Sequence, residues 1–373
     1  MRKPIAACAV LAAGALAVGT LTACNSEGGK AVKVVATTTQ VCDYATQIAS
    51  DPSISLEKTD SEGKESRTGN GETIKLTCLL APNASAHNHE MTPKQMKALA
   101  DADILLTSGV DLEHFLDGAV QSSGFHGKKV VTSGVEGGKP VGDGEHVDIA
   151  KWPFPPEEGE SEPEFQYDPH VWTSPRNAEI QVSNVGKALA DAAEHPEPIK
   201  QRTETFRKQL EDLDGWTKKA IDSVPKAHRV LFTSHDAFGY FSRDYQVKFI
   251  GAALSDFNEQ QDATADHIKS AVDQVKASGA NALFAENSNN PKSIEAIAKA
   301  AGVRAVIGDD ALYGDSLGPV GSDGETYIGS ITHNVTNLTK AWQGKVPELP
   351  ESLRDHAPKD TIADAPQGNP QGK

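Results

Sequence analysis

Residues 198–224 read PIKQRTETFRKQLEDLDGWTKKAIDSV, and this stretch is the clearest indication of the fold. Its large apolar side chains recur at the spacing of one helical face; they are Ile199, Phe206, Leu210, Leu213, Trp216 and Ile221. A helix of about 25 residues is about 38 Å long, because each residue advances it by about 1.5 Å. A helix of that length can run the height of two domains, so we expect it to join two halves of the chain.

Strands and helices alternate on both sides of this segment. Before it, strands are expected at residues 32–36, 74–80, 104–107 and 129–132, and helices at 41–49, 92–100 and 112–120. After it, strands are expected at residues 229–233, 247–250, 282–285 and 305–307, and helices at 262–278, 294–301 and 326–342. This alternation favours parallel sheets with helices on their faces. The predicted fold class is α/β, with two lobes, each holding a mostly parallel sheet flanked by helices, joined by one long helix.

The predicted organisation follows from the same pattern. It comprises an N-terminal lobe at 32–197, the linking helix at 198–224, a C-terminal lobe at 225–345 and a flexible, proline-rich tail at 346–373. Two polar segments interrupt the N-terminal lobe. Residues 57–72 are expected to form a solvated hairpin or loop, and residues 134–167 an inserted acidic loop rich in proline and glycine.

The start of the chain has the features of an export signal. A basic beginning is followed by an apolar run over residues 5–21 and then by the lipobox Leu-Thr-Ala-Cys, which ends at Cys24. The run is alanine-rich and too short to span a bilayer comfortably. We therefore predict a signal peptide at 1–23, lipid attachment at Cys24, a tether at 24–31, and a mature protein anchored to the outer face of the cell membrane.

Two of the four cysteines remain once the signal peptide and Cys24 are set aside. These are Cys42 and Cys78, and neither has the close spacing of a Cys-x-x-Cys metal site. Outside the cell two leftover thiols usually pair. The sequence therefore predicts a disulfide between Cys42 and Cys78.

The net charge of the chain is -16 at pH 7. An acidic protein of this kind is repelled by the phosphates of nucleic acid, which argues against a nucleic-acid partner. The same negative charge is compatible with a protein that binds cations.

Metal-binding side chains occur in four separate loops. In chain order the loops carry His87 and His89, then His170 within Asp168-Pro169-His170, then His235 followed by Asp236, and finally Asp315. These loops fall near the carboxyl ends of predicted strands, where ligands of open α/β sheets gather. Since two loops come from each half, a metal ion between the lobes could draw donors from both. From the residues alone, Asp309, Asp310 and Glu286 are equal candidates with Asp315 for the carboxylate.

Three motifs carry a resemblance to a known family. They are DADILLTSGVDLEHFL at 101–116, DPHVWTSP at 168–175 and SHDAFGYFSRDY at 234–245. Together they resemble the zinc- and manganese-binding lipoproteins of metal ABC importers, the cluster A-I solute-binding proteins, over nearly the whole mature chain. The resemblance implies two lobes bridged by a long rigid helix, with the metal in the cleft between them.

The resemblance also implies the ligands. Carried over motif by motif, they are His87, His170, His235 and Asp315. The segment before the first histidine usually reads Asp-Pro in the family but reads Ser85-Ala86 here, so His89 is an alternative to His87. Glu286 is the alternative to Asp315.

The third ligand position bears on the choice of metal. In the family a histidine there is typical of zinc binders and a glutamate of manganese binders, so His235 points to Zn²⁺ rather than Mn²⁺ as the transported ion. Imidazole suits zinc, whereas manganese favours oxygen donors. Three nitrogens and one carboxylate would close a tetrahedral site and leave no position for water, which disfavours hydrolysis. We thus expect a monomeric binding protein, not an enzyme, whose partner is the permease of an ABC importer.

Two other functions fit parts of the sequence. A zinc hydrolase could use His87 and His89 as a pair with Asp236 or Glu286 as the base, but the chain lacks the His-Glu-x-x-His and Gly-x-Ser-x-Gly motifs. An adhesin or structural lipoprotein could hold a metal that only stabilises the fold. Reversible binding of one ion without unfolding would distinguish a transport protein from both.

Overall fold

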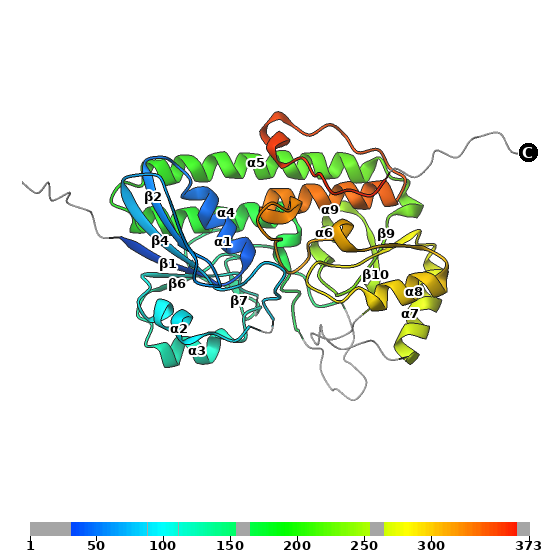
Figure 1. Ribbon diagram of the computed structural model, residues 1–373, viewed down its shortest axis with the longest axis horizontal. Helices are drawn as coiled ribbons and strands as arrows, with labels where there is room; N and C mark the ends of the chain where they lie inside the picture. The colour runs from blue at the N-terminus through cyan, green and yellow to red at the C-terminus, as the bar shows by residue number, and fades with distance from the viewer. Residues whose placement is uncertain (1–30, 88, 111, 154–164, 254–264, 364–373) are drawn as a thin grey trace, which may run out of the picture.

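The computed structural model describes residues 31–363 apart from 88, 111, 154–164 and 254–264. The predicted signal peptide, the predicted lipid attachment at Cys24, nearly all of the predicted tether and residues 154–164 of the acidic insertion lie outside these residues. Among the described helices, none combines the length and the apolar character that crossing a bilayer requires. The chain forms two lobes side by side, with one long helix lying along both (Figure 1).

The N-terminal lobe is built on a sheet that has six strands within the described residues. The spatial order is β3-β2-β4-β1-β5-β6. The strands are β1 (Val32–Ala36), β2 (Ile54–Thr59), β3 (Glu65–Thr68), β4 (Glu72–Cys78), β5 (Ile104–Thr107) and β6 (Lys128–Val131). Only the β2–β3 pair is antiparallel. The central strand β1 is apolar and buried along most of its length because helices cover both faces of the sheet there.

Helices cover this sheet unequally. On one face lie α1 (Thr39–Ile48) and α4 (Pro175–Ala192), whose apolar side chains join the main core of the protein. On the other face, α2 (Pro93–Ala100) and α3 (Leu116–Ser123) pack over a smaller apolar cluster. A capping box at Thr92 and Gln95 and a proline in the first turn fix the start of α2.

The C-terminal lobe has a parallel sheet with four strands in the described part of the chain. Its order is β10-β9-β11-β12, formed by β9 (Val230–Thr233), β10 (Lys248–Ala252), β11 (Ala282–Phe284) and β12 (Arg304–Val306). Its helices are α6 (Gly239–Tyr245), α7 (Ala265–Ser278), α8 (Lys292–Ala301) and α9 (Tyr327–Ala341). Residues of α7 and α8 form an apolar cluster with the sheet, while α9 belongs to the main core.

The long helix α5 spans Glu197–Asp222, within two residues of the predicted limits. All six apolar residues that predicted it are buried. It packs against α1 and α4 of the first lobe and against α6 and α9 of the second, and in Figure 1 it runs over both. The predicted fold class is confirmed.

The predicted disulfide is present. Cys42 in α1 is bonded to Cys78 at the end of β4, with 5.6 Å between the two Cα atoms. The bond ties the first helix of the N-terminal lobe to its sheet.

The first polar segment forms the hairpin that was one of its two predicted forms, and the second contains short regular elements. Residues 57–72 form the hairpin of β2 and β3, and β2 also pairs in parallel with β4. In the insertion at 134–167, a short hairpin joins β7 (Val135–Glu136) to β8 (Lys139–Pro140). The insertion is also anchored through Val147 and Phe165, which are buried. The predicted acidic loop is therefore partly anchored to the lobe in the residues that the structure describes.

The predicted flexible tail at 346–373 is wrong for its first part. Residues 346–363 pack against α9 and α5. The short helix η5 (Glu351–His356) contacts both helices. Leu353 and Ile362 are buried in the main core. The Trp216 indole donates a hydrogen bond to the carbonyl of Pro347 at 3.0 Å, and the backbone N–H of Ile362 donates one to Asn337 Oδ1 at 3.0 Å. Burial of apolar side chains outweighs the polar, proline-rich composition here.

The packing of this tail leads to a stability prediction. Leu353→Ala should lower the free energy of unfolding by about 2–5 kcal/mol, because it leaves a cavity beside α5 and α9. Urea unfolding followed by circular dichroism measures the change. Val320→Ala is the control, since Val320 is 87% exposed and its truncation should change stability by less than about 0.5 kcal/mol. Equal effects of the two substitutions would show that the tail does not pack as described.

Candidate metal centre

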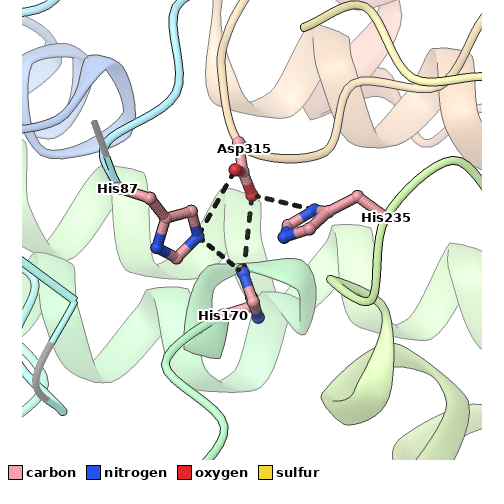
Figure 2. A group of neighbouring side chains, drawn as sticks. All are labelled: His87, His170, His235 and Asp315. Carbon is pink, nitrogen blue, oxygen red and sulfur yellow. Dashed lines mark hydrogen bonds and ion pairs between the residues drawn. The ribbon is translucent and has the colours of Figure 1, made fainter. Parts of the chain in front are cut away.

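Four side chains from four loops meet between the lobes. His87 lies on the loop after β4, His170 directly before the short helix η1 (Val171–Thr173), His235 after β9, and Asp315 beyond β12. One ligand atom from each lies within 4.8 Å of the ligand atoms of the other three. Figure 2 shows the three imidazoles turned toward the carboxylate of Asp315. The structure thus brings together the four residues that the motifs pointed to.

The distances between these atoms suit a single bound ion. Nε2 of His87 lies 3.1 Å from Nε2 of His170 and 3.4 Å from Oδ2 of Asp315. Oδ1 of Asp315 lies 3.6 Å from His170 Nε2 and 3.6 Å from His235 Nδ1. In a tetrahedral zinc site with bonds of about 2.0–2.1 Å, the donor atoms lie about 3.3 Å apart. Small shifts would bring all four to one ion.

The site is almost completely buried. The exposed fractions of the side chains are 3% for His87, 0% for His170, 5% for His235 and 1% for Asp315. Burial alone would raise the pKa of the Asp315 carboxyl, but the three imidazoles and the Ser85 hydroxyl outweigh burial and hold that pKa well below its usual range. Burial lowers the pKa of His87 well below its ordinary value. Both shifts favour a carboxylate and a neutral imidazole, the forms that bind a metal.

The Asp-Pro-His segment orients the second histidine. His170 Nδ1 lies 2.8 Å from Oδ1 of Asp168, and the His170 backbone N–H donates to the same oxygen at 2.9 Å. The Tyr240 hydroxyl donates to the Asp168 carbonyl at 2.8 Å. A carboxylate on one ring nitrogen leaves the other, Nε2, directed at the site and raises its basicity.

Residues of the N-terminal lobe also hold Asp315. The Ser85 hydroxyl donates to Asp315 Oδ2 at 2.9 Å and accepts a hydrogen bond from the His87 backbone N–H at 3.2 Å. The Gln40 side chain donates to the Asp315 carbonyl at 3.0 Å. Sequence reasoning did not identify Ser85 or Gln40 as part of the site, because nothing in their local sequence shows that they contact a residue more than 200 positions away.

His89, the alternative to His87, lies outside this group. Its ring is 5.1 Å from that of Phe115, and it is half-buried on the side of the loop that faces α2. Burial lowers the pKa of His89, an effect that a hydrogen bond with Gln95 opposes. The two histidines thus point to different surroundings although one residue separates them.

Glu286, the alternative to Asp315, is adjacent to the site without being one of the four donors. Its Oε1 accepts a hydrogen bond from the His235 backbone N–H at 2.9 Å, and its Oε2 lies 3.7 Å from His235 Nδ1. Burial raises the pKa of this carboxyl. A Cβ atom at Gly314 would lie 1.9 Å from Glu286 Oε2, so any larger residue at 314 would require the Glu286 carboxylate to move.

The other acidic candidates are not part of the group. Asp309 and Asp310 lie in the short helix η3 (Gly308–Asp310), and Asp236 follows His235 without joining the four donors. The pairing of His87 with His89 that a hydrolase would need is absent from the described site.

A family model described as "Zinc-uptake complex component A periplasmic" matches residues 34–341. The chain belongs to this zinc-uptake component A family. The resemblance predicted from the motifs is therefore confirmed, as a metal-binding substrate-binding protein of the cluster A-I type.

Curated members of the family bind different metals, according to their names. The chain is 28% identical over 344 residues to the manganese-binding lipoprotein MntA of Bacillus subtilis. The alignment covers 89% of this chain and 98% of MntA. It is 25% identical over 334 residues to the iron ABC transporter substrate-binding lipoprotein MtsA of Streptococcus pyogenes, covering 87% and 95% of the two chains.

The third relative has a solved structure. The zinc-binding protein TroA of Treponema pallidum is 28% identical over 272 residues, which is 72% of this chain and 82% of TroA. A structure of TroA superimposes with a TM-score of 0.64 at 25% identity, covering 84% of this chain and 99% of that one. These zinc-uptake component A relatives are binding proteins, so the prediction that the chain is not an enzyme is confirmed.

Proposed function

We propose that the chain captures Zn²⁺ between its lobes through His87, His170, His235 and Asp315, and delivers it to the permease of an ABC importer. One observation carries the proposal. Three imidazole nitrogens and one carboxylate oxygen, all from buried side chains, have ligand atoms within 4.8 Å of one another. A site of this kind is complete without water, which suits an ion that must be held and released unchanged.

The donor set supports zinc as the cargo. Relatives are named for manganese, iron or zinc, so the family alone leaves the metal open. Imidazole nitrogen favours zinc, whereas manganese prefers carboxylate, carbonyl and water oxygens. Only one of the four donors here is an oxygen ligand, because the third position is His235.

The position of the site between the lobes supports a mechanism of release. His87 and His170 belong to the N-terminal lobe, and His235 and Asp315 to the C-terminal lobe. A small tilt of one lobe would therefore remove half of the ligands. The continuous helix α5 resists a large hinge motion, so we propose that the loaded and empty forms differ by a small tilt and by loop movement.

We propose the same location and domain division as the sequence suggests. Residues 1–23 act as a lipoprotein signal peptide, and lipid on Cys24 anchors a monomer to the outer face of the cell membrane. The lipobox supports this, and two of the relatives are named lipoproteins. The lobes at 32–197 and 225–345 on either side of the helix at 198–224 form the binding unit.

Metal competition tests the proposal. Purified residues 25–373 should bind one Zn²⁺ and prefer it to Mn²⁺ by at least about 100-fold, since nitrogen-rich sites follow the Irving–Williams order. Elemental analysis of protein purified without added metal, followed by titration of zinc against manganese with a chelating dye, measures the preference. Equal or tighter binding of manganese would disprove zinc as the cargo but leave the site itself intact.

A further inference from the structure

The loop that carries Asp315 is held by a residue that does not touch the site. Asn287 Nδ2 donates a hydrogen bond to the Ser316 carbonyl at 3.0 Å, and Asn287 Oδ1 accepts one from the Gly314 backbone N–H at 3.4 Å. One side-chain amide therefore binds the peptide groups on both sides of Asp315. This arrangement limits rotation of the backbone from which the carboxylate extends.

The same amide also reaches the other lobe. Asn287 Nδ2 donates to Asn83 Oδ1 at 2.8 Å, and the Asn83 backbone N–H donates to the Leu317 carbonyl at 3.0 Å. Asn83 lies four residues before His87, on the same loop. The asparagine pair, Asn83 and Asn287, thus connects the loop of one ligand in the N-terminal lobe with the loop of another in the C-terminal lobe.

The backbone of Asn83 is suited to this role. Its φ angle is +62°, in the left-handed region, which asparagine tolerates better than most residues other than glycine. This conformation occurs where the backbone N–H of Asn83 bonds to Leu317 and its side chain bonds to Asn287.

Two adjacent side chains hold both ligands of the C-terminal lobe. Glu286 accepts a hydrogen bond from the backbone N–H of His235, and Asn287 binds the peptides beside Asp315. Both lie within three residues of the end of β11, so the end of one buried strand helps to place two of the four donors.

We propose that Asn287 is a positioning residue that fixes the direction of the Asp315 carboxylate and, through Asn83, couples closing of the lobes to completion of the metal site. The bond between the asparagines breaks when the lobes separate and forms when they close, so it slows release of the ion. This inference rests on the proposed four-donor site, and it does not depend on which metal is carried.

Release kinetics of the full mature protein test the inference, with Zn²⁺ as the probe. Asn287→Ala should weaken zinc binding by about 10–100-fold, the range found when groups that orient a metal ligand are removed. Asn83→Gly permits the left-handed backbone and keeps the N–H bond to the Leu317 carbonyl, but it removes the side-chain bond to Asn287. It should speed release into a chelator several-fold and leave the association rate unchanged. The double variant should bind no more weakly than Asn287→Ala, because both substitutions break the same bond.

Asn290→Ala is the matched control. Asn290 is exposed on the same loop, and its side chain accepts a local hydrogen bond from the Lys292 backbone N–H. Its substitution should leave affinity and release unchanged. Thermal melting of each metal-free variant shows whether it is folded. If Asn287→Ala is unfolded, Asn83→Gly still decides the inference, because it alters no contact within the C-terminal lobe.

The outcomes separate this inference from the proposed function. Parental affinity and release in folded Asn287→Ala and Asn83→Gly, with binding lost in Asp315→Ala, would overturn the role of the asparagine pair alone. Parental binding in Asp315→Ala would overturn the proposed site and the inference with it. Additive losses in the double variant would show that the two asparagines act separately, which also contradicts the coupling.

Discussion

Replacing Asp315 with alanine is expected to lower the affinity for zinc by more than about 100-fold, beyond the loss that follows removal of a group that only orients a ligand. Asp315 supplies the one negative charge among the four donors, and all three imidazoles lie around it. Without it, a dication would be held by neutral rings alone in a buried site, where an uncompensated charge is costly. Competition with a zinc-chelating dye measures the loss.

A second ligand variant and a histidine control accompany this measurement. His170→Ala should weaken binding at least as much, because His170 is fully buried and held in place by Asp168. His89→Ala should bind like the parent protein, since His89 lies outside the group of donors although it shares a loop with His87. Parental affinity in both ligand variants would remove this site from consideration.

Zinc affinity should also fall steeply on acidification, by up to about tenfold per pH unit for each imidazole that must lose a proton. The direction follows from the ligand form, because only neutral imidazole binds. Burial lowers the pKa of His87, so protons compete at this residue only on the acid side of the ordinary value near 6.5. The pKa of Asp315 is held low, so its carboxylate stays ionised and the imidazoles account for the loss.

Titration at successive pH values from about 7.5 to about 5 measures this dependence, with circular dichroism confirming that the protein stays folded. The profile of His89→Ala should follow that of the parent. An affinity that stayed constant over this range would show that no imidazole with an ordinary pKa near 6.5 is a donor.

The fold could be predicted where apolar periodicity is strong. The helix α5 and the central strands carry continuous or regularly spaced apolar residues, and they were placed to within a few residues. The sequence leaves a hairpin and a loop open at 57–72, because all four residues of β3 are exposed and no apolar alternation marks them. The packing of the tail could not be predicted because its apolar residues, Val346, Leu349, Leu353 and Ile362, are isolated within a polar, proline-rich segment.

The four donors could be proposed from sequence because each lies in a short motif near a strand or helix end. The choice between His87 and His89 could not be made, since it depends on which way each side chain points from one loop. The supporting contacts were also beyond reach. Ser85 and Asp315 are 230 residues apart, and Asn83 and Asn287 are 204 apart, so no local pattern reveals that these side chains meet.

The wide separation of the donors along the chain has a consequence for where the cargo is acquired. A polypeptide that crosses a membrane in extended form has its imidazoles and carboxylate far apart, so it offers only weak, isolated contacts to any ion inside the cell. High affinity arises only after both lobes have formed. If the chain is exported before it folds, as the proposed signal peptide implies, its synthesis would therefore not deplete the cytosol of the metal ion.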